Sequence, residues 1–178
     1  MRNKFKHNYS LSSPRTGFTL IEFLIYSVIV AFLIGSLVLS GINILQGRAR
    51  ASVMEDVNYN GRIAIDRITS HIRASEGINS PAIGDSSDYL SLQFSGRTVV
   101  FDLDEDNILQ IKVGLEDAIP LISEKTEVVN LDFINTSQST STPAVIKIEM
   151  TLKYRNLSGR QEYDFQRKFQ TTETAKII

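Results

Sequence analysis

The stretch Gly-Phe-Thr-Leu-Ile-Glu at residues 17–22 decides the predicted fold, because it separates two segments of opposite character. Residues 1–16 are polar and basic, with four Lys or Arg side chains and no acidic one. From Phe18 to Leu45 the sequence is apolar, small or weakly polar, and Glu22 is its one charged side chain. Crossing a bilayer takes about 20 apolar residues. The sequence therefore predicts that this run forms a membrane-spanning helix.

Two general kinds of segment explain part of this pattern. A secretory signal peptide has an apolar region of about 7–15 residues followed by a small-residue cleavage site. Here the apolar run is about twice that length, and the weak match at residues 49–51 has Arg48 beside it. A plain single-pass anchor explains the length, and its basic leader would stay in the cytoplasm. In an anchor, Glu22 would simply lie near the lipid headgroups, where a charge is inexpensive.

The motif Gly-Phe-Thr-Leu-x-Glu after a short basic leader resembles the class III signal of type IV pilins and pseudopilins. The resemblance implies that a membrane prepilin peptidase cuts between Gly17 and Phe18 on the cytoplasmic face and methylates the new Phe18 amine. Residues 1–17 would then be a leader peptide, and the helix would be retained. A charge in hydrocarbon costs about 2.5–3.5 kcal/mol. The family assigns Glu22 to pair with the Phe18 amine of a neighbouring subunit, which fixes the axial register.

Beyond residue 45 the composition becomes polar while the helical period continues. At 100° per residue, one arc of about 120° collects seven small or apolar residues, and charged residues lie opposite them. Glu76-Gly77 is a plausible helix stop, with Gly in the C′ position. Residues 18–76 are therefore predicted to form one helix, with residues 18–45 in the membrane or filament core and residues 46–76 amphipathic. The arc contains Val53, Val57, Gly61, Ala64, Ile65, Ile68 and Ile72.

Residues 77–178 are predicted to form a globular domain rich in β-structure. From Tyr89 onward apolar residues recur every second position, and turn residues such as Ser95-Gly96 separate the runs. The clearest strand, residues 146–154, alternates apolar residues with Lys, Glu and Thr. Six such runs predict an antiparallel sheet, or two small sheets, packed on the amphipathic part of the helix. The fold class is therefore α+β.

This order, a long helix and then a sheet, is similar to the layout of pilin-like proteins. Residues 66–74 and the strand-rich second half resemble minor pseudopilins of the J type and their PilW-like relatives. Major pilins commonly have a helix-bending proline about 22 residues into the mature chain, whereas this chain has Leu39 nearby and no proline. The resemblance therefore implies a minor subunit. Its partners would be the prepilin peptidase, other minor pilins or pseudopilins, the major subunit and the inner-membrane assembly platform.

Composition and charge exclude several other functions. The chain has no cysteine, so disulfides and thiolate chemistry are absent. The leader holds four of the 19 basic residues, which leaves 15 basic and 20 acidic residues in 18–178, a net charge of −5. Nucleic-acid binding, which favours a basic face, is not expected. With His71 the one histidine outside the leader and no phosphate-binding loop, neither an enzyme nor a cofactor is expected.

One acidic segment weakly resembles the start of a calcium-binding loop. Asp102, Asp104 and Asp106 alternate along the chain and precede Asn107. An EF-hand loop needs Gly at its sixth position and Glu at its twelfth, and this chain has Asn107 and Val113 there. The three aspartates remain a weak metal candidate. An acidic hairpin turn that stays soluble through its charge explains them more simply.

These observations predict a minor pilin or pseudopilin that initiates or caps a type IV pilus or a type II secretion pseudopilus. It would reside in the inner membrane as a single-pass protein with its N-terminus in the cytoplasm, and it would later enter the filament. An alternative is a membrane-tethered binding module, an adhesin or a DNA-uptake receptor, exported by the same signal. Its Ser/Thr-rich segment 136–143 would be the likeliest binding loop.

Overall fold

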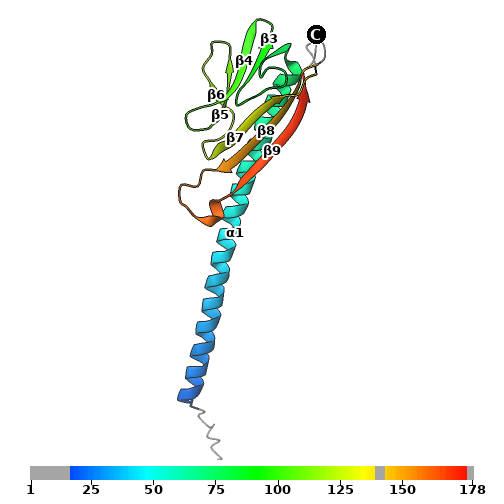
Figure 1. The fold of residues 1–178 in the computed structure, drawn as a ribbon. Coiled ribbons are helices and arrows are strands. Elements are labelled where there is room, and N and C mark those ends of the chain that lie inside the picture. Colours follow the sequence, from blue (N-terminus) through cyan, green and yellow to red (C-terminus); the bar gives the residue numbers. More distant parts are fainter. Residues whose placement is uncertain (1–16, 139–142, 176–178) are drawn as a thin grey trace, which may run out of the picture. The chain divides into compact units, whose positions relative to one another are not determined.

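The computed structural model describes residues 17–138 and 143–175, and it divides into two compact units, residues 1–44 and 45–178. The predicted leader, apart from Gly17, and residues 139–142 of the predicted binding loop lie outside the described residues. The first unit contains the beginning of helix α1 (Leu20–Ala74). The second unit contains the rest of α1 and all the described strands (Figure 1). The α+β fold class is confirmed.

The amphipathic part of α1 packs as the periodicity predicts. Six of the seven residues in the predicted arc are buried, and Ile65 is half-buried. The charged residues predicted to lie opposite, such as Arg62 and Asp66, are exposed. Burial of this stripe therefore holds the second half of α1 against the sheets. Two polar residues of α1, Asn60 and Thr69, are also buried. Asn60 accepts a 2.8 Å hydrogen bond at its Oδ1 from the backbone N–H of Ser123, which links α1 to the loop before strand β7.

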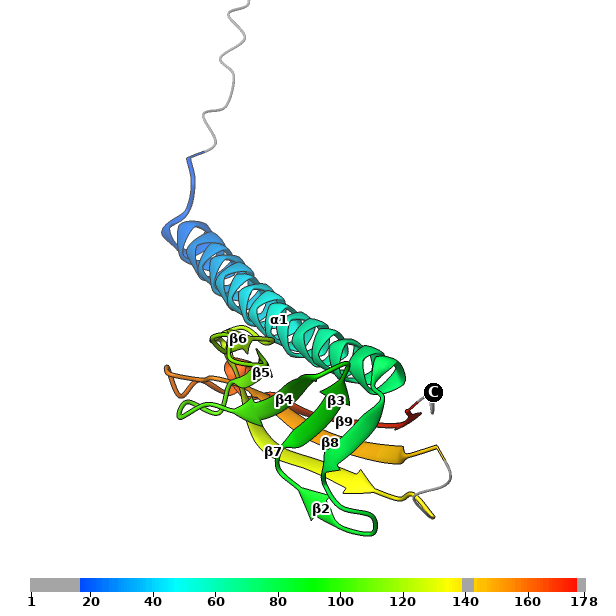
Figure 2. The same ribbon diagram turned by 90° about the horizontal axis from the view of Figure 1, so that it is seen from above.

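Two antiparallel sheets make up the remainder of the second unit (Figure 2). The first sheet has the order β1-β3-β4-β5-β6, and the second has the order β2-β7-β8-β9. Both sheets contribute to one hydrophobic core with α1. The strands are β1 (Gly77–Ser80), β2 (Ser86–Ser87), β3 (Leu90–Phe94), β4 (Arg97–Leu103), β5 (Leu109–Val113), β6 (Ile119–Pro120), β7 (Thr126–Asn135), β8 (Val145–Tyr154) and β9 (Gln166–Thr174), with a short 3-10 helix at Gln161–Tyr163 before β9.

A β-bulge in β7 explains why its buried apolar residues stand at an even-numbered position before the bulge and at odd-numbered positions after it. The register against β8 shifts between Val128 and Asn130. Val128 is buried before the bulge, and Leu131 and Phe133 are buried after it, while Val129 is 56% exposed. The extra residue at a bulge is left unpaired, so the strand can present apolar side chains to the core on both sides of it.

The structure corrects several element boundaries. Helix α1 begins at Leu20 and ends at Ala74, whereas the sequence predicted residues 18–76. Nine strands occur among the described residues, and the sequence predicted six. The strands that were missed, β1, β2 and β6, have two to four residues each and are too short to show an alternating pattern.

Candidate functional site

The predicted cleavage site lies immediately before helix α1 and is accessible. Gly17 and Phe18 are both exposed and outside the helix, and the Phe18 side chain is 74% exposed. Exposed, non-helical backbone is the form in which proteases accept a chain. The bond between Gly17 and Phe18 therefore lies in exposed backbone outside the helix.

Thr19 caps the N-terminus of α1. The backbone N–H of Glu22 donates a 3.3 Å hydrogen bond to Thr19 Oγ1, and the backbone N–H of Phe23 donates to the Thr19 carbonyl oxygen at 3.1 Å. Threonine followed three residues later by glutamate is the capping-box pattern. This pattern was visible in residues 19–22, and it explains why the helix starts at Leu20 rather than at Phe18.

Glu22 lies in the first turn of α1, where a negative charge interacts favourably with the helix dipole. The Tyr26 hydroxyl, one turn further on, donates a long hydrogen bond of 3.4 Å to Glu22 Oε1. The ring of Tyr26 also lies 5.9 Å from that of Phe18, centroid to centroid. Tyr26, which the sequence analysis did not single out, thus contacts both Phe18 and Glu22. Among the described residues, no ion pair includes Glu22.

The apolar part of α1 surrounds this carboxylate with exposed hydrophobic side chains. Within the described residues, α1 is the one helix that is long and apolar enough to cross a membrane, and none of its most apolar window is buried. Phe23, Phe32 and Leu37, for example, are 69–79% exposed. Side chains of this kind need a cover of lipid or of other apolar helices.

The three aspartates of the weak metal candidate do not converge. Asp104 Oδ1 accepts hydrogen bonds from the backbone N–H groups of Asp106 (2.9 Å) and Ile108 (2.7 Å), so this carboxylate organises the turn after β4. Asp102 lies within β4, opposite Gln110, and its Oδ1 is buried with no hydrogen-bond partner. No group of three or more Asp, Glu, His or Cys residues in the described chain is arranged to hold a metal ion.

His71 has a structural environment. Its ring makes edge contacts with the rings of Phe94, at 6.1 Å, and Phe101, at 5.4 Å between centroids. Its Nδ1 lies 2.8 Å from the carbonyl oxygen of Arg67, one turn earlier on α1. The two ring contacts connect α1 to strands β3 and β4 of the first sheet.

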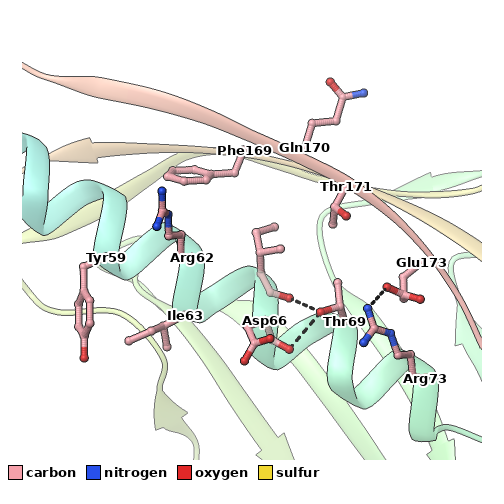
Figure 3. Close-up of a pocket in the computed structure, with 11 residues that line it drawn as sticks. Tyr59, Arg62, Ile63, Asp66, Thr69, Arg73, Phe169, Gln170, Thr171 and Glu173 are labelled. Carbon is pink, nitrogen blue, oxygen red and sulfur yellow. Dashed lines mark hydrogen bonds and ion pairs between the residues drawn. The ribbon is translucent and has the colours of Figure 1, made fainter.

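A groove of about 710 Å³ runs between α1 and β9, a feature that no sequence pattern indicated (Figure 3). One of its lining residues is Phe169, whose ring lies against Gly61: a Cβ at position 61 would come within 2.1 Å of a ring carbon. Any larger residue at position 61 would displace this ring. The groove is lined by Tyr59, Arg62, Ile63, Ile65, Asp66, Thr69, Arg73, Phe169, Gln170, Thr171 and Glu173.

Polar contacts link the two walls of the groove near its ends. Arg73 Nη2 forms an ion pair of 2.7 Å with Glu173 Oε2. This hydrogen bond lowers the pKa of Glu173 and raises that of Arg73. Near the other end, Arg167 donates a 2.5 Å hydrogen bond to Asn58 Oδ1, and its guanidinium lies 5.6 Å from the centroid of the Phe169 ring.

No protein-family model, curated protein or solved structure matches this chain. The site is therefore interpreted from the chain's own residues and geometry. A long N-terminal helix with an apolar first part, followed by antiparallel sheets that pack on its second part, fits a pilin-like architecture.

Proposed function

We propose that this protein is a minor pilin or pseudopilin, a structural subunit that initiates or caps a type IV pilus or a type II secretion pseudopilus. The observation that carries the proposal is a lone carboxylate, Glu22, near the start of an exposed apolar helix and directly after an accessible Gly17–Phe18 bond. A plain membrane anchor requires neither feature. An assembling subunit uses both.

In this proposal, a prepilin peptidase cuts between Gly17 and Phe18 on the cytoplasmic face and methylates the Phe18 amine. The cut creates a cation at the start of the retained helix, four residues from Glu22. Until assembly, the protein is stored in the inner membrane with its globular unit outside the cytoplasm.

Assembly would then provide a partner for the Glu22 carboxylate, which the membrane would remove from water. In a staggered stack of parallel helices, Glu22 of one subunit pairs with the Phe18 amine of its neighbour, and the pair fixes the register between them. A charge removed from water is stable only when it is paired and hydrogen-bonded. The Tyr26 hydroxyl supplies a further hydrogen bond to the same carboxylate.

The remaining partners would be a motor for extension and the other subunits of the filament. The sequence contains no phosphate-binding loop, so a separate cytoplasmic ATPase would drive extension through the inner-membrane assembly platform. The amphipathic half of α1 and the two sheets would contact other minor subunits and the major subunit.

Intact-mass analysis of protein extracted from membranes tests the proposal. In cells that have a prepilin peptidase, the mature chain is expected to start at N-methylated Phe18. Gly17→Val should block the cut because it adds a β-branched side chain at the scissile position, whereas the matched substitution Gly35→Val within α1 should leave it unchanged. Recovery of wild-type chains that all begin at Met1 would overturn the proposal.

A further inference from the structure

Strand β9 lies at the edge of the second sheet, and only one of its two sides is paired. It pairs with β8 over nine residues, from Gln166 to Lys153 at one end and from Thr174 to Val145 at the other, and no described strand pairs with its opposite side. Free backbone N–H and C=O groups on an edge are a template for another strand. The longest edge of the described sheets is therefore open.

The other sheet edges are short or interrupted. In the first sheet, β1 has four residues with a register irregularity, and β6 has two residues, one of them Pro120. The edge of β7 is broken by its bulge, and its neighbours include β2 and the carbonyl oxygen of Asn107, which accepts from the Val128 N–H. Such devices prevent edge pairing. Within the described chain, β9 is the long edge that has neither a bulge nor a proline, although it carries charged residues such as Lys168.

The groove beside β9 would receive the side chains of an added strand. Phe169, Thr171 and Glu173 alternate along β9 and line the groove, so they lie on the face of the strand that is directed toward α1 (Figure 3). Alternate residues of a strand share one face. A strand added to β9 would therefore place every second side chain in the groove, against Ile65 and Phe169.

The charge around the groove specifies what that strand carries. Arg73 and Glu173 neutralise each other, whereas Arg62 and Arg167 form no ion pair among the described residues, and Asp66 is the one unpaired carboxylate of the lining. The lining itself holds two arginines and two carboxylates, and Arg167, beside the Phe169 ring, brings the local net charge to +1, whereas residues 18–178 together carry −5. A carboxylate on the incoming strand would complement Arg62.

We propose that β9 and the groove bind an extended segment of another subunit of the same assembly by strand addition. The segment presents apolar side chains to the floor of the groove and a carboxylate to Arg62. Backbone hydrogen bonds to the edge give affinity, and the groove gives specificity. The identity of the partner as a fellow subunit rests on the proposed function, whereas strand addition rests on the edge and the groove alone.

A peptide that alternates in this way tests the binding mode on the full chain in detergent micelles. The probe is a labelled, end-capped peptide of sequence Glu-Thr-Val-Thr-Val-Thr-Glu, which places its Val and Glu side chains on one face. Binding is measured by fluorescence anisotropy, and amide hydrogen exchange locates it. We expect protection of residues 166–174, and a five- to tenfold loss of affinity in Arg62→Glu, because one exposed ion pair becomes a repulsion.

Matched controls separate strand addition from general attraction. Arg97→Glu, on an exposed position of β4, changes the net charge equally and should not affect binding. A peptide with Lys in place of Glu, or with N-methylated backbone amides, should bind at least fivefold more weakly. Equal binding to Arg62→Glu, protection outside β9, or no binding at about 1 mM peptide would overturn the inference.

A second copy of the chain is the remaining occupant to exclude. If the protein alone self-associates with protection of β9 amides, the edge is occupied by a copy of itself, and the assignment to another subunit is wrong. Failure of the peptide experiment would leave cleavage at Phe18 intact, and failure of cleavage would leave peptide binding intact. The two proposals therefore fail separately.

Discussion

At the residue scale, Glu22 would be costly to place in a membrane, and it has one defined side-chain contact. A carboxylate in hydrocarbon costs about 2.5–3.5 kcal/mol on insertion scales. Within the described chain its side-chain contact is the 3.4 Å hydrogen bond from Tyr26, which offsets only part of that cost. In the proposed assembly, the remaining cost would favour association with a partner that carries a positive charge.

Substitution of Glu22 separates membrane insertion from assembly. Glu22→Gln should insert as well as the wild type, because it removes the charge, but it should reduce incorporation into filaments by tenfold or more. Glu22→Asp keeps the charge and should retain part of the incorporation. Membrane fractionation and the subunit content of sheared filaments are the measurements. Normal incorporation of the Gln variant would show that the carboxylate does not set the register.

The contact between Gly61 and Phe169 predicts that Gly61→Ala changes stability in opposite directions with and without the Phe169 ring. Alanine favours a helix over glycine by about 1 kcal/mol. At position 61, however, the added Cβ would displace the Phe169 ring, so Gly61→Ala should destabilise the wild type by about 1 kcal/mol. In a Phe169→Ala background the same change should stabilise. Denaturant unfolding in a fixed detergent gives both values.

Gly47→Ala is the matched control for this cycle. It lies on the same helix, and a Cβ there would meet no atom within 4 Å. It should stabilise slightly, and equally, in both backgrounds. If Gly61→Ala behaved like Gly47→Ala in the wild type, the close approach would not be present in solution.

At the scale of elements, the pairing of β8 with β9 is reinforced by charge. Lys147 and Lys168 both contact Glu149, at 2.6 and 2.5 Å. The hydrogen bond from Lys147, followed by that from Lys168, lowers the pKa of Glu149 from 4.5 to about 2. Because the pKa is lower in the folded state, the stabilising contribution is full above pH 4.5 and is lost as the pH falls toward 2.

Glu149→Gln should therefore flatten the pH dependence of stability between about pH 4.5 and 2, and it should have its largest effect at neutral pH. Unfolding midpoints measured across this range test the expectation. Glu105→Gln is the control, because Glu105 is exposed in the turn after β4 and forms no ion pair among the described residues. An unchanged pH profile for Glu149→Gln would show that the three charges do not interact in solution.

Local pattern predicted some elements well and others poorly. The buried stripe of α1 and the turn at Ser95-Gly96 follow from periodicity and turn chemistry, which depend on neighbouring residues. The approach of Phe169 to Gly61 joins segments about 100 residues apart, and the open edge of β9 depends on which other strands fail to reach it. No window of the sequence contains that information. The capping pair Thr19 and Glu22, in contrast, was readable and was missed.

At the scale of the whole molecule, the division at residue 45 separates a part with its own hydrophobic core from a part that has none. Residues 45–178 contain the hydrophobic core, with contributions from α1 and both sheets. Residues 20–44 contribute no buried residue and depend on an apolar surrounding. The boundary lies next to the predicted change at residues 45 and 46, where the helix turns from apolar to amphipathic.

Removal of residues 1–44 is expected to leave a soluble, folded domain. Its free energy of unfolding, measured with denaturant, should stay within about 0.5 kcal/mol of that of the full chain, because every residue of the core is retained. The truncated protein should not partition into membranes. Circular dichroism, amide hydrogen exchange and vesicle flotation test these outcomes. Loss of protection in the core strands would show that the second unit does not fold independently.

The cap at Thr19 has a consequence for the order of events at the membrane. Every hydrogen bond that starts the helix is made by residues 19–23, downstream of the Gly17–Phe18 bond. Severing that bond would remove the leading tail without breaking a single helical contact. Helix α1 would already be folded before cleavage, so maturation would need no local unwinding and no refolding afterwards.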